Sequence, residues 1–249
     1  MWCKNCNIET NEEFCPICNT KTIEDIPNEV YWCSNCNIPV IQDINKIDKG
    51  ICPICGKTMK YLSTDLRPVF PEERLLVEII IGVKPNEYIK DSVWASNNRY
   101  YINGRAIAIP SKFYEEADAD KIIEQLDINK DKNTYVFFDK HIENFLKANE
   151  GRLNYLIDEA HSFICRAAEK FDEENIVLSF SGGKDSTVTA DIVIKALGNP
   201  SLVHIFGDTT LEFPMTIQYA NRYRENHSQA IFQIAKNREQ DFYDVCEDI

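Results

Sequence analysis

The sequence predicts a multidomain protein of mixed α and β structure, and three observations support this. Eight of the ten cysteines form four CxxC pairs near the N-terminus. The middle of the chain combines β-prone residues with Asn-Asn and Asn-Gly turn signals. Further on, an apolar strand-like run, a glycine-rich loop and an apolar helical run follow one another. We therefore expect two N-terminal zinc ribbons, a small α+β module and an α/β domain.

The composition is typical of folded globular protein, with 44% hydrophobic and 27% charged residues among 249. No apolar run approaches the roughly 20 residues that cross a bilayer, and the opening "MWCKNC" does not resemble a secretion signal. We expect a cytoplasmic protein without a membrane partner. The formal net charge of -13 argues against a large nonspecific nucleic-acid interface, although a local basic patch stays open.

The CxxC pairs fall into two sets, with 8 residues between the pairs of the first set and 15 in the second. Two such turns aim four thiolates at one point and complete a tetrahedral zinc site. The motifs "WCKNCNI" and "CPICNTKT" of the first set are echoed by "WCSNCNI" and "CPICGKTM" in the second. The sequence therefore predicts two tandem ribbons with two structural zinc ions, held by Cys3, Cys6, Cys15 and Cys18, and by Cys33, Cys36, Cys52 and Cys55.

Other interpretations of these cysteines are weaker. Disulfides would need an oxidising compartment, and the duplication disfavours a redox or iron-sulfur site. Four thiolate ligands leave no open coordination position, so the zinc is expected to be structural. Docking to RNA, DNA or a protein partner is an additional role that stays open. Trp2 and Trp32 precede the first cysteine of each ribbon and either serve docking or cap the small core.

The middle of the chain is expected to form a small, mostly antiparallel sheet with a helix. A linker-like stretch at 63–73 precedes the apolar run "RLLVEIIIGV" at 74–83. Turn signals follow at Asn97-Asn98 and Asn103-Gly104. "KFYEEADADKIIEQLD" has helical spacing, and "TYVFFD" is predicted to be one more strand. We assign no chemical role to this part.

Residues 152–171 show apolar positions at three-, four- and seven-residue spacing, which predicts an amphipathic helix. Cys165, on this helix, is interpreted as a small buried residue and not as a nucleophile. His141 and His161 lack metal-ligand spacing and are interpreted as surface residues or as helix residues with satisfied hydrogen bonds.

The stretch "IVLSFSGGKDSTVTADIVIKALG" at 176–198 predicts a strand, a tight loop and a helix. Gly182 and Gly183 allow the close approach of a ligand, and the loop N–H groups meet at a helix N-terminus, where an anion is favoured. Lys184 adds a positive charge, and Asp185 is placed to hold Mg²⁺ or a water. The spacing differs from a Walker A loop. We expect a phosphate-binding site here.

The loop "SGGKDS" resembles the pyrophosphate loop of the PP-loop ATP pyrophosphatases. That family includes phosphoadenosine phosphosulfate (PAPS) reductases, the small subunit of ATP sulfurylase and several tRNA thiolation enzymes. The segment "SLVHIFGDTTLEFPMTIQYANRYREN" at 201–226 resembles the "DTG..FPET" segment of PAPS reductases. The resemblance implies Mg²⁺ with ATP, adenosine phosphosulfate or PAPS. The implied nucleotide-binding residues are Ser179, Ser181, Gly182, Gly183, Lys184, Asp185, Ser186, Asp208 and Thr209.

The sequence departs from PAPS reductases at several positions. Thr210 stands where they usually have Gly, and Met215 where they usually have Glu. The "DTT" form is closer to the ATP sulfurylase small subunit, so the substrate stays open. No position matches the reductase cysteine near the C-terminus, since Cys246 lies elsewhere, and we assign no catalytic residue. His204, inside a predicted strand, is interpreted as a core residue.

The resemblance implies a doubly wound parallel sheet with strand order 3-2-1-4-5. "IVLSF", "SLVHIF" and "AIFQIA" are placed as strands 1, 2 and 3, and "NREQDFYDVCEDI" as a helix. Strands 4 and 5 have no counterpart, so we expect the N-terminal part of a longer protein or a shortened gene product. Strand 1 would then be an edge strand with an uncovered apolar face. The combination with zinc ribbons is similar to a group of PAPS reductase-like proteins in archaea and anaerobic bacteria.

The expected domains are zinc ribbons at 1–22 and 30–62, an α+β module at 70–149 and a PP-loop domain at 150–249. The resemblance implies an adenine-nucleotide-binding enzyme of sulfur metabolism, either an oxidoreductase that reduces PAPS or a transferase that adenylates a substrate. One alternative is an ATP-dependent sulfurtransferase acting on tRNA or DNA. Another is a zinc-ribbon interaction protein whose nucleotide half is inactive. Enzymatic activity itself stays open at this point.

Overall fold

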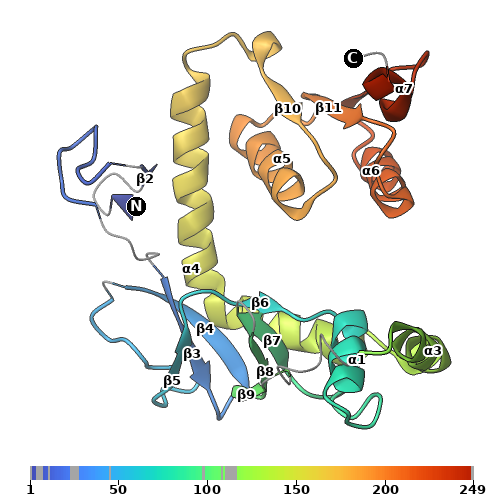
Figure 1. The fold of residues 1–249 in the computed structure, drawn as a ribbon. Coiled ribbons are helices and arrows are strands. Elements are labelled where there is room, and N and C mark those ends of the chain that lie inside the picture. Colours follow the sequence, from blue (N-terminus) through green and yellow to red (C-terminus); the bar gives the residue numbers. More distant parts are fainter. Residues whose placement is uncertain are drawn as a thin grey trace. The chain divides into compact units, whose positions relative to one another are not determined.

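The computed structural model describes residues 2–3, 8–10, 12–22, 28–44, 46–96, 99–107, 109 and 117–247. The chain divides into two compact units, Met1–Leu153 and Asn154–Ile249 (Figure 1). It is multidomain, with cysteine clusters and mixed α and β structure that includes a parallel sheet. The finer division into four domains stays a prediction.

Two small cysteine-bearing sheets, the first and second ribbon, begin the first unit. In the first, β1 (Trp2–Cys3) pairs with β2 (Ile8–Glu9) in antiparallel fashion. The second has three antiparallel strands in the order β4-β3-β5. These are β3 (Asn28–Cys33), β4 (Ile38–Asp43) and β5 (Lys60–Ser63).

The repeated CPIC motifs adopt the same turn. In each, the backbone N–H of the residue four positions after the first cysteine donates to the carbonyl of that cysteine. Asn19 donates to Cys15 and Gly56 to Cys52, both at 2.9 Å. Asn19 and Gly56 both have left-handed backbone, with φ of 54° and 68°. The sequence repeat is therefore also a structural repeat.

An antiparallel sheet with two helices follows in the first unit, as expected for an α+β arrangement. The strand order is β6 (Arg67–Pro68), β7 (Val93–Ser96), β8 (Arg99–Ile102) and β9 (Arg105–Ile107). The predicted Asn103-Gly104 turn joins β8 to β9, with φ of 48° and 74° at its two residues. Asn97 and Asn98 lie outside the described residues. Helix α3 (Ala119–Asn129) and the 3₁₀ turn η1 (Lys130–Lys132) come next.

The apolar run at 74–83 belongs to helix α1 (Pro71–Ile80) and not to the sheet. Its buried face includes an ion pair in which Arg74 Nη1 donates to Glu78 Oε1 at 2.5 Å. Arg74 Nη2 also donates to Asn133 Oδ1 at 2.6 Å, and the Asn86 N–H donates to Glu78 at 2.6 Å. A buried charge is costly unless it is paired. The network therefore joins α1 to the loop at Asn86 and to the segment at Asn133.

The strand predicted at "TYVFFD" is wrong, because α4 (Val136–Ala168) begins there. Phe138 packs on Phe70 with ring centroids 5.1 Å apart, and Phe145, seven residues later, packs on Trp94 at 4.9 Å. Asn149, four residues further, accepts from the Ile41 N–H at 2.6 Å and donates to the Pro39 carbonyl at 3.1 Å. A helical face of contacts thus overrides the local β propensity of the aromatic residues.

The helix predicted at 152–171 is confirmed in type, but it is the second half of α4 and ends at Ala168. Ile164 packs against the core of the second unit. The expectation that Cys165 is buried is wrong, because this residue is exposed and its thiol donates to the Ala196 carbonyl at 3.4 Å.

The second unit contains the parallel sheet. Strands β10 (Val177–Ser179), β11 (Val203–Asp208) and β12 (Ile231–Lys236) are adjacent in this order, which places the three predicted strands correctly. Helices α5 (Lys184–Leu197) and α6 (Pro214–Asn226) cover one face of the sheet, above Leu178, Phe180 and Phe206 (Figure 1). Two shorter elements, η2 (Glu173–Asn175) and α7 (Phe242–Glu247), complete the unit.

The other face of the sheet is exposed within the described part of the chain. Val177, Ile205 and Ile231 are all exposed there, although parallel sheets are usually covered on both faces.

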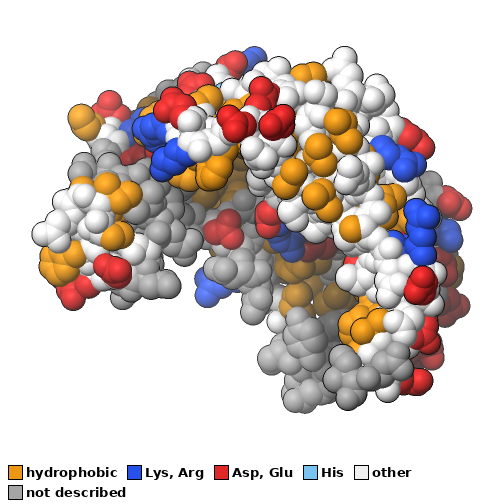
Figure 2. Space-filling view, turned by 90° about the horizontal axis from the view of Figure 1, so that it is seen from above, with side chains coloured by type: hydrophobic (Ala, Val, Ile, Leu, Met, Phe, Trp, Pro, Cys, Tyr) orange, Lys and Arg blue, Asp and Glu red, His pale blue; other side chains and the backbone are white. Residues whose placement is uncertain are grey.

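The charged side chains of the surface form no single basic area in the view of Figure 2: acidic and basic side chains are interspersed, and the basic ones form separate groups. None of the described helices has the length and apolarity needed to cross a membrane.

His204 is a core residue, as predicted. It is fully buried on β11, its Nδ1 lies 2.9 Å from the Leu202 carbonyl oxygen, and its Nε2 lies 3.3 Å from the Tyr223 hydroxyl. Burial lowers the pKa of His204 below its usual value, because desolvation disfavours the charged imidazolium.

Trp32 is also a packing residue. Its side chain is buried, and it lies against Gly104 in the β8–β9 turn, so it does not present a docking surface. A Cβ atom at Gly104 would overlap the indole ring. The contact of Trp32 with Gly104 is therefore one of the contacts that join the second ribbon to the four-stranded sheet; Asn37 also donates to Asn103 Oδ1 at 2.8 Å. The Trp2 side chain lies outside the described residues.

We predict that Gly104→Ala destabilises the first unit more than Gly82→Ala does. Both glycines have φ near 75°, but nothing lies within 4 Å of a Cβ built at Gly82. The control should therefore lose about 1 kcal/mol to backbone strain, and Gly104→Ala roughly 1 to 3 kcal/mol more through overlap with Trp32. Denaturant unfolding of both variants measures the difference. Equal losses would show that the indole ring adapts at no cost.

We further predict that the second unit loses stability on acidification through His204. A folded-state pKa below the unfolded value means that the unfolded chain binds the proton first, so stability falls as the pH drops below about 6.5. Thermal unfolding from about pH 7 to about pH 5 should show a smaller decrease for His204→Gln than for the wild type. The same decrease in both proteins would place the acid sensitivity at other groups.

Candidate functional site

The second ribbon gathers four sulfur atoms into a metal-sized cluster. The Sγ atoms of Cys33, Cys36, Cys52 and Cys55 all lie within 4.8 Å of one another. Cys33 and Cys55 sulfurs are 3.6 Å apart, and those of Cys36 and Cys52 are 3.9 Å apart. Four ligands at a zinc–sulfur distance of about 2.3 Å would be about 3.8 Å from each other. A disulfide would need about 2.05 Å, so this geometry fits a metal site and not a cross-link.

The first ribbon brings together Cys3, Cys15 and Cys18 in the same way. The sulfurs of Cys3 and Cys18 are 3.5 Å apart. Cys6, the fourth predicted ligand, lies outside the described residues. The three described thiols nevertheless repeat the arrangement of the second ribbon.

Backbone groups and burial set the chemistry of these thiols. The Cys36 N–H donates to Cys33 Sγ, and the Ile17 N–H donates to Cys15 Sγ, both at 3.4 Å. Such donors favour a thiolate and orient it for a metal. Burial raises the pKa of the Cys33 thiol, and that of Cys36 to about 12. A hydrogen bond with the backbone of Lys57 lowers the pKa of the Cys55 thiol to about 7.

The glycine loop lies between β10 and α5, with Phe180 buried beneath it. Gly182 has φ of 74°, and a Cβ there would come within 3.2 Å of Thr216 Cγ2 at the start of α6. A side chain at Gly182 would therefore have to displace the Thr216 methyl group slightly and would also strain the left-handed backbone. Gly183 is the N-cap of α5 with φ of -81° and has more room, because a Cβ there would meet only Ser181 Oγ at 3.4 Å.

Hydroxyl groups close the loop onto the first turn of α5. Ser186 Oγ accepts from the Ser181 N–H at 3.2 Å and donates to the Gly183 carbonyl at 3.0 Å. Thr187 Oγ1 donates to the same carbonyl at 2.8 Å and lies 3.0 Å from the Tyr219 hydroxyl. The sequence identified the serines but gave no signal for the Thr187–Tyr219 contact, which depends on α5 and α6 packing side by side.

Lys184 and Asp185 project from the loop into solvent. Their side chains are 91% and 89% exposed and form an ion pair with 3.3 Å between Nζ and Oδ1. Exposed pairs of this kind contribute little stability. Both side chains are therefore free to turn toward a bound molecule at small cost.

Asp208 ends β11 and forms an ion pair with Lys236 at the end of β12, at 2.8 Å. The Lys236 ammonium, with the Thr210 N–H, lowers the pKa of Asp208. Lys236 was not among the predicted site residues. Ligands of open α/β sheets bind at the carboxyl ends of the strands. Lys236 could have been found from this rule, because it directly follows the predicted third strand.

The segment after β11 holds an unusual backbone conformation. Thr210 has φ of 71°, which is rare for a β-branched residue. Its hydroxyl accepts from the Phe242 N–H of α7 at 2.9 Å. The glycine that PAPS reductases usually have at this position is the residue that adopts positive φ most easily. At the preceding residue, the Thr209 N–H and hydroxyl donate to the Glu212 carboxylate at 3.0 and 2.9 Å.

The predicted nucleotide-binding residues thus fall in two adjacent segments. Ser179 is the last residue of β10, and the residues from Ser181 to Ser186 follow this strand. Asp208 and Thr209 lie at the end of the neighbouring strand β11. Because the strands are parallel, both segments emerge at the carboxyl edge of one sheet. Whether they bind nucleotide stays a prediction at this point. Cys246 lies on α7 and is exposed.

Comparison with known proteins bears on this region. Residues 175–244 match the family model of the phosphoadenosine phosphosulfate reductase domain. The chain is also 32% identical over 136 residues to an uncharacterized protein of Methanocaldococcus jannaschii. That match covers 52% of this chain but only 28% of the archaeal protein. No solved structure matches the chain.

The family match covers β10, the glycine loop, α5, β11, α6, β12 and the first part of α7. It confirms the resemblance predicted from the two motifs, which both lie inside it. The segment at 175–244 is therefore phosphoadenosine phosphosulfate reductase-like, and it carries the glycine loop at the carboxyl edge of its parallel sheet.

Proposed function

We propose that the second unit binds an adenine nucleotide, with the phosphates on the loop at 181–186 and the rest of the nucleotide toward Asp208 and Thr209. The observation that carries the proposal is the loop itself, which places glycines, hydroxyls and a lysine at the N-terminus of α5. The first turn of a helix offers N–H groups without intrahelical partners, and these favour anions. The family match supports an adenine nucleotide as the anion.

The charges of the site favour a nucleotide that arrives with Mg²⁺. Lys184 and Lys236 contribute two positive charges, but Asp185, Asp208 and Glu212 contribute three negative ones. A polyphosphate bound next to this set would meet net repulsion without a cation. Asp185 would hold Mg²⁺ in the loop, because it supplies the loop's carboxylate and its exposed ion pair with Lys184 costs little to break.

The proposed chemistry is reduction of PAPS by a two-electron donor from outside the described chain, or adenylation of a substrate by ATP with release of pyrophosphate. In either case the protein supplies positioning and charge stabilisation: the loop amides hold phosphate oxygens, and Lys184 turns toward them. Which nucleotide binds most tightly separates the two. Sulfur transfer to tRNA or DNA, and an inactive nucleotide half, stay as alternatives, and pyrophosphate release with and without nucleic acid distinguishes them.

We predict that Gly183→Asp abolishes nucleotide binding without unfolding the protein. The site has room for the side chain, and Asp is a favoured N-cap residue, so α5 should be as stable or more stable. Its carboxylate would repel the phosphates and weaken binding about a hundredfold or more. Calorimetric titration with ATP, adenosine phosphosulfate and PAPS, each with Mg²⁺, measures the loss.

The matched control is Gly183→Asn, which has nearly the same shape, caps helices as well and carries no charge. We expect a much smaller loss of affinity for this variant. Equal affinity in the wild type and both variants would contradict binding at the loop. An absence of binding of all three nucleotides to the wild type would reject the proposed function for this chain.

We also propose that the two cysteine groups hold structural zinc. Thiolate ligands suit zinc, and a closed site of four would supply folding free energy and no open position for chemistry. The first ribbon would use Cys3, Cys6, Cys15 and Cys18, and the second would use the four cysteines of its cluster.

The zinc proposal predicts two metal ions per chain by native mass spectrometry, and loss of one ion in Cys36→Ser. Because the ligands bind as thiolates, binding releases protons and weakens as the pH falls. Cys165→Ser is the control, since Cys165 is exposed and outside both groups. Retention of both ions by Cys36→Ser, or an iron-sulfur absorption spectrum of the wild type, would contradict the assignment.

A further inference from the structure

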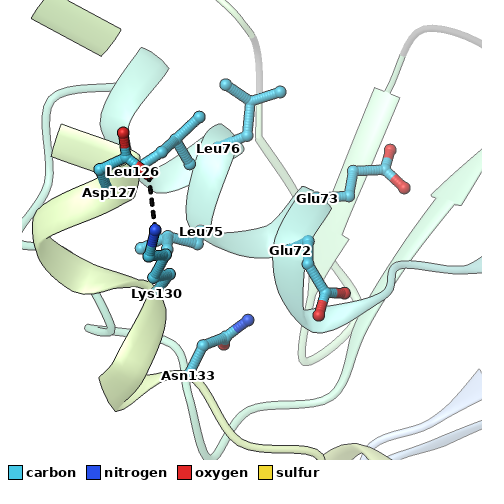
Figure 3. A pocket seen from close by; sticks show the side chains of 8 residues that line it. All are labelled: Glu72, Glu73, Leu75, Leu76, Leu126, Asp127, Lys130 and Asn133. Atoms are coloured by element: carbon cyan, nitrogen blue, oxygen red, sulfur yellow. Dashed lines mark hydrogen bonds and ion pairs between the residues drawn. The ribbon is translucent and has the colours of Figure 1, made fainter. Parts of the chain in front are cut away.

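A cavity of about 450 Å³ opens between α1 and α3 in the first unit (Figure 3). This volume lies in the range of sites that hold a small molecule or a few side chains. Its residues come from the first two turns of α1, the last turn of α3, η1 and the segment that follows.

Three leucines form the apolar part of the cavity wall. Leu75 and Leu76 of α1 face Leu126 of α3 across it (Figure 3). Leu75 is buried, whereas Leu76 and Leu126 are only half-buried. The two helices therefore leave part of their leucine surface open to a further apolar group.

Three carboxylates line the cavity, and they differ in the group that pairs with their negative charge. Glu73 accepts two hydrogen bonds from Arg67, both at 2.6 Å, and Asp127 pairs with Lys130 at 3.0 Å. Glu72 has a neutral donor instead, the Tyr135 hydroxyl at 2.8 Å. Burial and this bond to Glu72 raise the pKa of Tyr135 to about 12. Among the described residues, Glu72 is the cavity carboxylate that lacks a cationic partner.

The same combination of acidic and apolar side chains continues along α3. Ile123, one turn before Leu126 and Asp127, is 57% exposed. Asp120, one turn earlier again, is exposed as well. The surface from Asp120 to Asp127 is about 10 Å long at 1.5 Å per helical residue. A small molecule in the cavity would leave most of this surface uncovered, but a peptide segment would cover it.

We propose that this surface, formed by Glu72, Leu76, Ile123, Leu126 and the cavity between them, binds a basic amphipathic segment of a protein partner. An apolar side chain of the partner would fill the cavity against Leu75, Leu76 and Leu126. Lysine or arginine residues next to it would face Glu72 on one side and the acidic residues of α3 on the other. Amphipathic helices bind apolar grooves in this manner, with anchors at three- and four-residue spacing.

The test uses the full, zinc-loaded chain and a fluorescein-labelled peptide of about 14 residues, roughly four helical turns, with leucine at helical spacing and lysine elsewhere. A second peptide has glutamate in place of lysine. Fluorescence anisotropy should show saturable binding of the lysine peptide and none of the glutamate peptide. Binding of neither peptide would overturn the proposal.

Because the chain is acidic overall, the lysine peptide could bind by charge alone, and two variants separate this case. Glu72→Lys should weaken binding about tenfold or more, since it places like charges together at the cavity. Glu174→Lys, an exposed residue of the second unit, makes the same change in net charge and should leave binding unchanged. Equal losses in the two variants would show nonspecific attraction and overturn the assignment.

A substitution of Leu76 tests whether an apolar side chain of the peptide binds in the cavity. Leu76→Ser removes a half-buried wall of the cavity and should weaken binding about tenfold, while Val188→Ser, at an exposed apolar residue of α5, should not. Circular dichroism and thermal unfolding establish that each variant is folded. A Leu76→Ser protein that is folded and binds normally would exclude the cavity as the anchor site.

Discussion

The close approach of the glycine loop to α6 is the constraint on which the second unit depends. A side chain at Gly182 would press on the Thr216 methyl group and strain a backbone with φ of 74°, so glycine keeps the loop close to the start of α6. Helix α5 begins directly after this loop. The helix N-terminus, the loop hydroxyls and Asp208 are brought to one edge by this packing and by the parallel strand order. The proposed anion site would therefore rely on backbone N–H groups and on few cationic side chains, which suits an acidic chain.

Features that depend on local sequence were predictable. The CxxC spacing and its repetition indicated the cysteine clusters, and the alternation of apolar runs with turn residues indicated β10, α5 and β11. The Asn103-Gly104 turn was also predictable, because its left-handed backbone favours those two residues. The resemblance of two short motifs indicated the family that the comparison found at 175–244.

Features that depend on tertiary contacts were not predictable. The aromatic residues before α4 have strand propensity, and only their packing on Phe70 and Trp94 makes that segment helical. The Thr187–Tyr219 contact and the Lys236–Asp208 pair join residues that are 32 and 28 positions apart. The exposure of Cys165 and the cavity beside α1 likewise follow from how far neighbouring helices cover each other, which periodicity alone does not determine.

The cysteines of the second ribbon are part of a shared core. Cys33 and Cys52 pack with Met59 and with Ala148 of α4, and Asn149 of the same helix bonds to β4. Under the proposed zinc binding, metal occupancy and the folding of this region are thermodynamically linked, so stability increases with free zinc as with any ligand of the native state. Loss of the metal would then weaken not only the ribbon but also the contacts of Ala148 and Asn149 that hold α4 against it.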